Sequence, residues 1–363
     1  MRPREEVTLE IESIAYGGDG IGRHEGRVVF VPFTIPGEKV RTRITKAQRQ
    51  WARGELVEVI NASPDRVAPP CPWFTRCGGC AYQHIAYPRQ LEIKTRQVAE
   101  ALRRIGKITD PPVEPARPSP KDYHYRNRIT VHVDPPLIGF RGIDPREVVD
   151  IKACLLAEQG VNEALTALRL KRHPRPGPAT LRSDPEARGF RQVNDGAAEI
   201  LAGVVAEMAG SGELLVDAYC GAGFFAKRLR DRFTRIIGID WDARSIESAN
   251  CDLAGNEHYL AGDTSELLAD ALGEGQSAVV LLDPPAQGIA PPVIDTLLSA
   301  LPGRVVYVSC DPATLARDLS KLAHAYHLRR AVPVDMFPQT ASIETACLLE
   351  AKAGSSRSVG HAS

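Results

Sequence analysis

The fold class is indicated by residues 214–223, Leu-Leu-Val-Asp-Ala-Tyr-Cys-Gly-Ala-Gly, where a short apolar run ends at an acid and a glycine turn. Residues 234–240 form a second such run that ends in an acid, and two more, at 278–283 and 304–309, stop at Asp283-Pro284-Pro285 and at Cys310-Asp311-Pro312. Helix-like segments alternate with these runs, and a last strand-like run follows. This pattern predicts a doubly wound parallel sheet. Because such sheets bind ligands at the carboxyl ends of their strands, we expect one crevice lined by the glycine turn, carboxylates and a thiol.

The segments behind this prediction are helices at 195–210, 223–232 and 243–253, and strands at 213–219, 234–240, 278–283, 304–309 and 344–350. Cys310 taken alone is also compatible with an inert buried cysteine, because free cysteines are commonly buried. Its neighbours in the crevice therefore decide its role.

The length of the chain and the distribution of its charges limit the possible domain organisation and binding partners. A chain of 363 residues is long for one core and predicts two or three domains. The N-terminus lacks an apolar leader segment and no apolar run reaches the ~20 residues of a membrane helix, so we expect a cytoplasmic protein. Residues 1–191 carry 32 Lys+Arg against 23 Asp+Glu, whereas residues 192–363 carry 13 against 22. A basic half favours a polyanion and an acidic half a cationic cofactor, with solvated surface charge as the alternative.

Residues 7–60 alternate apolar and polar positions in short stretches at 7–11, 27–32, 39–44 and 53–60, which predicts a small barrel of four to five strands. The string at 16–23, Tyr-Gly-Gly-Asp-Gly-Ile-Gly-Arg, is interpreted as a hairpin turn because it lacks the Gly-Lys-Ser/Thr of a phosphate-binding loop. This string and the turn at 35–38 resemble a TRAM domain, an OB-like RNA-binding barrel. Candidate phosphate contacts are its basic residues Arg41, Arg43, Lys46, Arg49 and Arg53.

Three cysteines lie close together in residues 71–80, Cys-Pro-Trp-Phe-Thr-Arg-Cys-Gly-Gly-Cys. Disulfides are disfavoured in a reducing cytoplasm, so we interpret Cys71, Cys77 and Cys80 as metal ligands, with Cys154 as the candidate fourth. Zinc and a [4Fe–4S] cluster both accept four thiolates, and the spacing alone does not choose between them. Either metal centre would cross-link the 71–80 loop to the domain that contains Cys154.

The middle of the chain begins with a helix at 87–105 that has a basic face, followed by an extended proline-rich linker at 110–119. Strands are expected at 129–133 and 137–141. Arginines interleaved with aromatics around them suit single-stranded RNA, although an edge sheet with solvated arginines explains them equally well. Residues 171–188 contain four prolines among basic residues and are predicted to be a loop.

The acid at Asp240 after the glycine turn is typical of a ribose contact. NAD binding fits this pair as well, but the third glycine of the dinucleotide motif is missing. Together with Ala261-Gly262-Asp263 and Asp283-Pro284-Pro285, the layout is similar to that of S-adenosylmethionine (SAM)-dependent methyltransferases. Asp263 would then lie beside the adenine.

Taken together, these motifs resemble the RNA uracil-C5 methyltransferase family, within it the branch with a TRAM domain and an iron–sulfur cluster. That branch includes bacterial large-subunit rRNA enzymes and archaeal tRNA enzymes. The resemblance spans nearly the whole chain and is carried by the barrel, the four cysteines, the glycine turn, Asp283-Pro284-Pro285, and residues 190–194, 308–312 and 335–345.

The resemblance implies a Rossmann-like methyltransferase domain at 193–352, a TRAM barrel at 1–62, a small central α+β domain at 63–192 and a disordered tail at 353–363. We expect a monomer that acts on RNA, either 23S rRNA or tRNA. The resemblance also implies [4Fe–4S] ligation by Cys71, Cys77, Cys80 and Cys154, and SAM contacts from Gln192, Tyr219, Gly221, Gly223, Asp240, Asp263 and Asp283.

The chemistry explains why these residue types are needed. Uracil C5 is a poor nucleophile, so we expect the Cys310 thiolate to add to C6, making an enolate whose C5 attacks the sulfonium methyl group. The resemblance assigns removal of the C5 proton to Glu344, after which Cys310 is released. Asp283 is expected to hold cofactor or base, and Gln192 the cofactor or the uracil edge. The uracil must leave its stack to reach such a pocket.

Three other functions compete with this interpretation. Amino-group methyltransferases of adenine or cytosine carry an aromatic residue after the two prolines, where this chain has Ala286. A non-catalytic RNA-binding relative is suggested by Phe224 and Ala286, which stand where the family commonly has Asn and Arg, but Cys310 and Glu344 together argue against it. RNA cytosine-C5 methyltransferases add a cysteine beside the prolines, which is absent here. We therefore expect uracil-C5 methylation.

Overall fold

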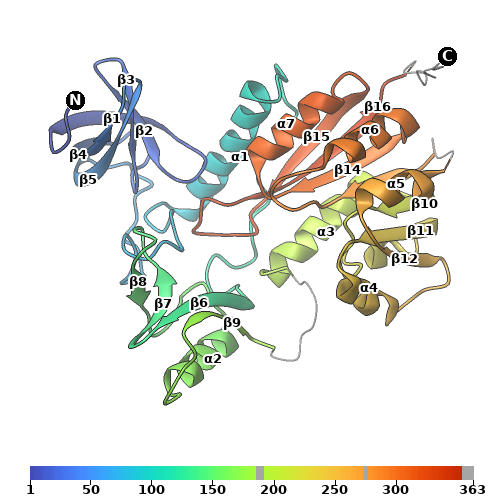
Figure 1. Ribbon diagram of the computed structural model, residues 1–363. Helices are drawn as coiled ribbons and strands as arrows, with labels where there is room; N and C mark the ends of the chain where they lie inside the picture. The colour runs from blue at the N-terminus through green and yellow to red at the C-terminus, as the bar shows by residue number, and fades with distance from the viewer. Residues whose placement is uncertain (185–191, 274–276, 354–363) are drawn as a thin grey trace.

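The computed structural model describes residues 1–184, 192–273 and 277–353, which form three connected parts (Figure 1). A small N-terminal barrel and a central sheet lie on one side, and a larger α/β part built from the C-terminal half lies on the other. Residues 354–363 of the expected tail, and residues 185–191 with Phe190 and Arg191 of the resembling motif, lie outside the described residues.

The C-terminal part is a seven-stranded sheet in the order β12-β11-β10-β13-β14-β16-β15, with helices on both faces (Figure 1). The strands β12 to β14 run parallel as expected, but β16 runs antiparallel between β14 and β15. The prediction of a wholly parallel sheet is therefore wrong at this edge. A short loop joins β15 to β16, and a short connection can join neighbouring strands only if they are antiparallel.

The elements of this part are α3 (Asp195–Ala209), β10 (Gly212–Asp217), the 3₁₀ turn η1 (Ala226–Leu229), β11 (Phe233–Asp240), α4 (Ala243–Asn250), β12 (Glu257–Ala261), α5 (Thr264–Leu272), β13 (Val279–Leu282), α6 (Pro291–Ala300), β14 (Arg304–Ser309), α7 (Pro312–Leu322), β15 (Tyr326–Val334) and β16 (Glu344–Ala351). The helix expected at 223–232 is reduced to η1. Gly221 and Gly223 have φ of 53° and 82°, a left-handed conformation that continues the turn instead of starting a helix.

The N-terminal part is a closed five-stranded barrel in the order β1-β2-β3-β5-β4, which confirms the expected OB-like barrel. Its strands are β1 (Glu6–Ile14), β2 (Gly20–His24), β3 (Arg27–Val31), β4 (Lys39–Ala47) and β5 (Trp51–Asn61). Alternate apolar side chains are buried inside it. The predicted turn at 16–23 is wrong in its second half, since β2 begins at Gly20. Glycine permits this close pairing: a Cβ on Gly22 would lie 2.7 Å from the Glu10 carbonyl oxygen.

The central part is a four-stranded sheet in the order β8-β7-β6-β9, covered by α2 (Gln159–Arg169). Its strands are β6 (Arg128–Asp134), β7 (Leu137–Arg141), β8 (Val148–Asp150) and β9 (Gly177–Arg182). The prediction of a loop over 171–188 is wrong for β9, which pairs antiparallel with β6. Its proline, Pro178, is tolerated because β9 is an edge strand, where a missing N–H breaks no second ladder.

The helix α1 (Tyr87–Arg104), which confirms the prediction at 87–105, packs against α7 and so joins the barrel side to the α/β part. Together α1, α5, α6 and α7 cover one face of the large sheet, and α3, η1 and α4 cover the other. The linker that follows α1 is extended, as expected, and runs parallel to β15 through bridges from Val113 to Ala331 and from Arg117 to Val334.

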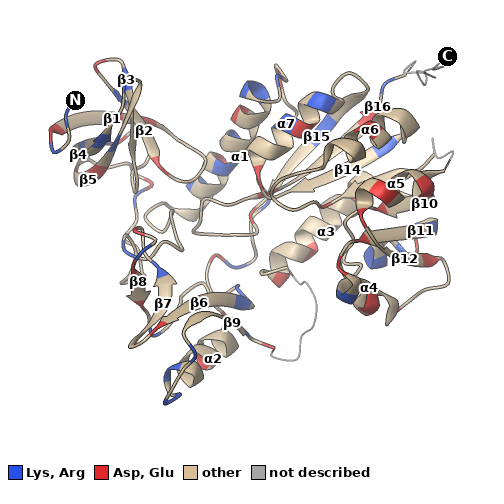
Figure 2. Ribbon diagram, viewed as in Figure 1, with Lys and Arg blue, Asp and Glu red and all other residues tan. Residues whose placement is uncertain are grey.

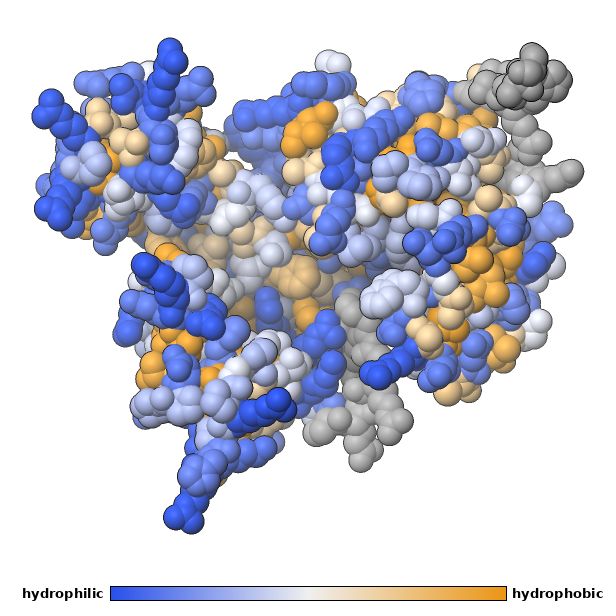
Figure 3. Space-filling view, in the orientation of Figure 1, coloured by the Kyte–Doolittle hydropathy of each residue, from blue (hydrophilic) through white to orange (hydrophobic). Residues whose placement is uncertain are grey.

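The charged residues are distributed over all three parts. Figure 2 marks Lys and Arg positions along the barrel, the central sheet, α1 and α7, and Asp and Glu positions on the barrel and most visibly on α5. The face where the three parts meet is hollowed (Figure 3). Among the described residues, no helix has both the length and the apolar character that are needed to cross a membrane.

Candidate active site

The register of the sheet brings three predicted site residues together. Ser309 pairs with Thr345 across β14 and β16, so Cys310, the next residue, lies opposite Glu344 at the start of β16. On the other side of β14, Leu282 pairs with Tyr307, which places Asp283 at the same end of the sheet. A thiol and two carboxylates from three adjacent strands therefore share one site.

Electrostatics at this site are dominated by burial and negative charge. Burial raises the pKa of the Cys310 thiol to about 11, and the charges of Glu344, Asp283 and Asp311 add to the shift. Burial also raises the pKa of Asp283 to about 7. Glu344 is buried, and its pKa is raised well above the ordinary range, with Asp283 as a further cause. A site with this potential favours a bound cation and disfavours a free thiolate at neutral pH.

The glycine turn after β10 is tied to the acid that ends β11. Asp240 accepts hydrogen bonds from the Gly221 N–H at 2.8 Å and from the Asp242 N–H at 2.9 Å. Gly223 is crowded, since a Cβ there would lie 2.8 Å from the Tyr259 hydroxyl. The turn therefore presents bare backbone at the strand ends, with the half-buried Asp240 carboxylate beside it.

Asp217, the last residue of β10, was quoted in the sequence pattern but not recognised as a site residue. Its side chain is fully buried, and within the described residues neither carboxylate oxygen has a well-formed hydrogen bond. Burial raises its pKa to about 8, Asp283 and Asp240 add to the shift, and the backbone N–H groups of Ala226 and Tyr219 oppose it. Full burial of this acid, beside the glycine turn that the sequence assigned to the cofactor, is visible only in the folded structure.

Three other predicted cofactor residues are placed as follows. Asp263 is exposed and caps α5 by accepting from the Ser265 N–H at 2.8 Å. Tyr219 follows β10 and has its pKa raised to about 12 by burial, with Asp263 as a neighbouring charge. Gln192 is buried. Its backbone carbonyl accepts a hydrogen bond from the Asn127 side chain at 2.7 Å, which links the start of the central sheet to the segment before α3. Asp263 thus has a structural role as a helix cap whatever it binds.

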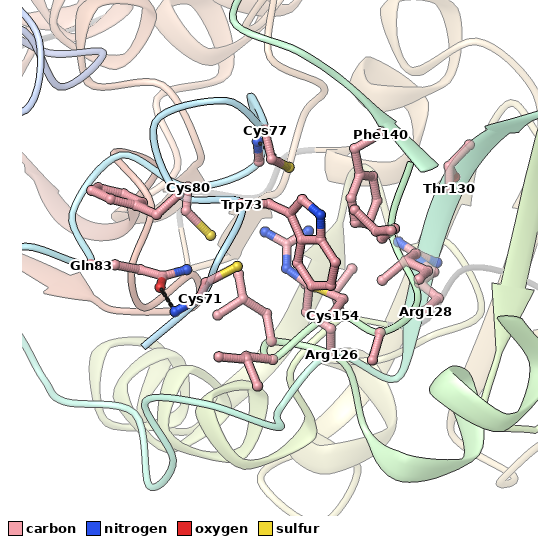
Figure 4. A pocket seen from close by; sticks show the side chains of 18 of the residues that line it. Cys71, Trp73, Cys77, Cys80, Gln83, Arg126, Arg128, Thr130, Phe140 and Cys154 are labelled. Atoms are coloured by element: carbon pink, nitrogen blue, oxygen red, sulfur yellow. Dashed lines mark hydrogen bonds between the residues drawn. The ribbon is translucent and has the colours of Figure 1, made fainter. Parts of the chain in front are cut away.

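The four cysteines line a separate cavity of about 510 Å³ between the 71–80 loop and the central sheet (Figure 4). Cys71, Cys77 and Cys80 reach it from the loop, and Cys154 comes from the segment before α2. The loop is docked by its glycines, because the Gly78 N–H donates to the Arg141 carbonyl at 3.0 Å. In the described part of the chain, no cluster of three or more His, Cys, Asp or Glu is arranged to hold a metal ion.

Burial also acts on these thiols. It raises the pKa of Cys80 to about 12 and raises the pKa values of Cys77 and Cys154 above the ordinary range. Hydrogen bonds hold the backbone of the first and the last of the four cysteines. The Cys71 N–H donates to Gln83 Oε1 at 3.3 Å, and the Cys154 N–H donates to Asn162 Oδ1 at 2.8 Å. The backbone is therefore held at Cys71 and Cys154, and ionising the thiols requires a compensating positive charge.

An arginine lies close to each of the two positions, Ala286 and Phe224, at which this chain departs from the family pattern. Beside Ala286, where the family commonly has arginine, Arg317 of α7 donates to the Gln287 carbonyl at 2.7 Å, so a guanidinium still reaches this loop. At Phe224, the Arg228 guanidinium lies 4.0 Å from the ring centroid. The loop at Ala286 therefore keeps a basic side chain nearby, and Phe224 has a cation–π neighbour.

The barrel also reaches the site, which the sequence reasoning did not predict. The Tyr16 hydroxyl donates to the Cys310 carbonyl at 3.2 Å. Tyr16 belongs to the glycine-rich string that was interpreted only as turn chemistry, and nothing in its local pattern pointed to a residue so distant along the chain.

Comparisons with known proteins agree with this architecture. Residues 2–57 match the TRAM domain family, and residues 265–352 match the tRNA (Uracil-5-)-methyltransferase family. An RNA methyltransferase of Gloeobacter violaceus is 32% identical over 443 aligned positions, covering 95% of this chain and 96% of that protein. The 23S rRNA (uracil(1939)-C(5))-methyltransferase RlmD of Acidithiobacillus ferrooxidans is 32% identical, covering 94% of this chain and 96% of that protein.

Among solved structures, the tRNA (uracil-54, C5)-methyltransferase of Pyrococcus abyssi, in complex with S-adenosyl-L-homocysteine, is similar to this chain. The match has a TM-score of 0.72 at 24% identity and covers 94% of this chain and 100% of that chain, which supports the fold over nearly its whole length. With the two family matches and the full-length relatives, these findings confirm the resemblance: the chain belongs to the family of RNA uracil-5-methyltransferases that carry an N-terminal TRAM domain.

Proposed function

We propose that this protein transfers a methyl group from SAM to C5 of one uridine in a structured RNA, through a covalent adduct between Cys310 and uracil C6. The observation that carries the proposal is the meeting of Cys310, Glu344 and Asp283 at the ends of three neighbouring strands. A ring-carbon methylation needs a nucleophile and a base within reach of one another, and this site offers both.

The residues present fit SAM as the methyl donor. The glycine turn offers backbone without side chains, and Asp240 beside it has lone pairs left for ribose hydroxyls. The buried carboxyl group of Asp217 and the acidic groups around Cys310 favour a ligand that carries positive charge, as SAM does on its sulfonium and amino groups. The proposed contact set is completed by Tyr219, Gly221, Gly223, Asp263 and Asp283, and by Gln192 at the cofactor or the uracil edge.

The proposed reaction uses two residues of this chain in sequence. The Cys310 thiol gives its proton to solvent, which a bound cation favours by lowering the thiol pKa. The thiolate then forms a C–S bond to C6, and the electron pair moves to C5, which takes the methyl group and leaves S-adenosylhomocysteine. Glu344 then accepts the C5 proton, the C5–C6 double bond re-forms, and the C–S bond breaks. A pKa raised above the ordinary carboxyl range suits this role, because a general base works best when its pKa lies near the working pH.

The proposed substrate is 23S rRNA, since RlmD of Acidithiobacillus ferrooxidans matches nearly the whole chain and is named for that activity. The Pyrococcus abyssi enzyme is named for tRNA, so tRNA is the second candidate. Mapping 5-methyluridine in total RNA from cells with and without this protein decides between them. Loss of the modification from one 23S rRNA position supports the proposal, and loss only from tRNA contradicts it.

The nucleophile is tested with RNA that carries 5-fluorouracil at the target position. Fluorine cannot be removed as a proton, so the adduct should accumulate and be visible as a protein–RNA band that survives denaturation. Cys310→Ala should form no band, and Cys251→Ala, at the exposed end of α4, should form it at the wild-type level. An adduct of unchanged yield with Cys310→Ala would show that the nucleophile is another residue.

We also propose that Cys71, Cys77, Cys80 and Cys154 hold a [4Fe–4S] cluster. The support is a set of four thiols around one cavity, a donor set typical of iron–sulfur and zinc centres. A cluster is larger than a single ion and keeps its thiolates further apart, so it is compatible with four thiols that line one cavity without converging as a single-ion site among the described residues. The group would cross-link the 71–80 loop to the segment before α2.

Iron and acid-labile sulfide analysis of anaerobically purified protein tests the centre. We expect about four irons and four sulfides per chain, with loss of both in Cys77→Ser. Zinc in place of iron, without sulfide, would contradict the cluster and leave a zinc staple at the same cysteines.

A further inference from the structure

The loop between β1 and β2 carries a barrel residue into the candidate active site. Tyr16 lies in this loop, and its hydroxyl donates to the carbonyl of Cys310 at 3.2 Å across 294 residues of sequence. Cys310 stands between the last strand pair of β14 and the N-cap of α7 at Asp311. The hydrogen bond therefore reaches the carbonyl of a residue that lies between the last strand pair and the helix cap.

The electrostatic setting keeps Tyr16 a hydrogen-bond donor. Burial raises the pKa of its hydroxyl, and the charges of Asp311, Cys310 and Glu344 raise it further. The hydroxyl is therefore protonated at neutral pH and cannot serve as a base. Tyr16 as a whole residue is 43% exposed, although its hydroxyl is bonded to the Cys310 carbonyl, so it lies at the solvent boundary of the site.

Contacts from two other parts fix the loop that carries Tyr16. The Gln97 side chain of α1 donates to the Ala15 carbonyl at 2.9 Å and to the Tyr82 hydroxyl at 3.0 Å. Gly18 packs so closely that a Cβ on it would lie 2.9 Å from the Ala81 Cβ. Asp19, at the far end of the loop, pairs with Arg53 of β5 at 2.9 Å. The loop is thus held by contacts to α1, to Ala81 just after the 71–80 loop, and to β5 of its own barrel.

We propose that Tyr16 is a positioning residue for the reaction, supplied by the TRAM barrel: its hydroxyl orients the Cys310 backbone so that the thiol points at uracil C6, and its ring borders the entry for the base. This inference rests on the proposed function, because it takes Cys310 as the nucleophile. It gives the barrel a part in the chemical step as well as in holding RNA. Small displacements of a nucleophile cost large factors in rate, which is why one hydrogen bond at this carbonyl matters.

The test compares Tyr16→Phe, Tyr16→Ala and the wild type in single-turnover methylation of the target RNA, with RNA affinity measured separately. Tyr16→Phe keeps the ring and loses only the donor, so we expect the maximal rate to fall about fivefold to tenfold. Tyr16→Ala also removes the ring and should fall about a hundredfold. RNA affinity should stay within about twofold of the wild type in Tyr16→Phe, because its backbone and charge are unchanged. Thr8→Val, which removes an exposed hydroxyl from β1 of the same barrel, should match the wild type in both measurements.

A purely RNA-holding role predicts the opposite split, with weaker affinity and an unchanged maximal rate, and that result would overturn the proposal. A wild-type rate for Tyr16→Phe would overturn it as well. Gly18→Ala provides a second variant, because displacing the loop should lower the rate in the same way while Tyr16 itself is intact. Cys310→Ala separates the two levels: if it still methylates RNA, the proposed function fails, whereas if it is inactive and Tyr16→Phe is normal, only the role of Tyr16 fails.

Discussion

Glu344 lies close enough to Cys310 to influence when its thiol ionises. Burial is the main cause that raises the thiol pKa to about 11, and the charge of Glu344 is the next largest contribution. A negative neighbour disfavours the thiolate, so removing that neighbour should lower the pKa. The binding of a cationic methyl donor would act in the same direction.

This argument predicts that Glu344→Gln shifts the pH profile of Cys310 alkylation to lower pH. The rate of labelling by iodoacetamide follows the thiolate fraction, so its midpoint should move from about 11 in the wild type toward the ordinary thiol range in the variant. Peptide mass spectrometry reads Cys310 separately, and the exposed Cys251 reports on the reagent itself. An unchanged or higher midpoint would show that the two groups do not interact.

The helix α1 illustrates how a single element couples the parts of the molecule. Its Lys94 is fully buried, donating to Asp335 at 2.6 Å and to the Phe337 carbonyl at 3.1 Å in the loop between β15 and β16. Gln90, one turn earlier, bonds to Gln339 in the same loop. That loop leads directly into Glu344, so α1 braces the segment that positions the proposed base.

Breaking this ion pair should cost much more than breaking one on the exposed face of the same helix. Lys94→Met leaves the buried Asp335 charge uncompensated and should lower the free energy of unfolding by about 3–5 kcal/mol. Arg96→Ala, which removes the exposed pair with Glu100, should change it by less than about 1 kcal/mol. Urea unfolding measures both. Adding Asp335→Asn to Lys94→Met should recover part of the loss, and no recovery would mean that packing dominates.

At the scale of the whole molecule, the basic N-terminal half is partly neutralised by its own acids. Arg41, Arg43 and Arg53, three of the five predicted phosphate contacts, form ion pairs with Glu58, Glu6 and Asp19 on the barrel surface. Lys46 lies 5.4 Å from the centroid of the Trp51 ring. Arg49, in the turn between β4 and β5, is exposed and takes part in no ion pair among the described residues. It is therefore the barrel residue best placed to contact a phosphate.

We expect RNA affinity to fall as salt rises, because each phosphate contact releases counterions. Arg49→Ala should reduce the slope of log affinity against log salt by about 0.7–0.9, the value for one contact. Arg235→Ala, at the start of β11 and away from the carboxyl ends of the strands, should leave the slope unchanged. Equal slopes for Arg49→Ala and the wild type would place the RNA away from this turn.

Much of the fold could be predicted from local sequence patterns. The period-two stretches of the barrel and the run ending in the glycine turn predicted their strands, because alternation and turn chemistry are encoded within a few residues. The expected loop at 171–188 failed over β9, since Pro178 is compatible with a strand only if that strand lies at an edge, and edge position is a property of the whole sheet. The antiparallel β16 was likewise beyond the reach of a local pattern.

The sequence by itself determined the residue types of the site: Cys310 and Asp283 after apolar runs, the glycine turn, and four cysteines at a ligand-like spacing. Only the tertiary structure decided which of them meet, by setting the β14–β16 register that faces Cys310 toward Glu344, by burying Asp217 at the end of β10, and by folding the barrel so that Tyr16 reaches Cys310. The physical reason is that strand and turn preferences act between near neighbours, whereas registers, burial and contacts between domains follow from how the whole chain packs.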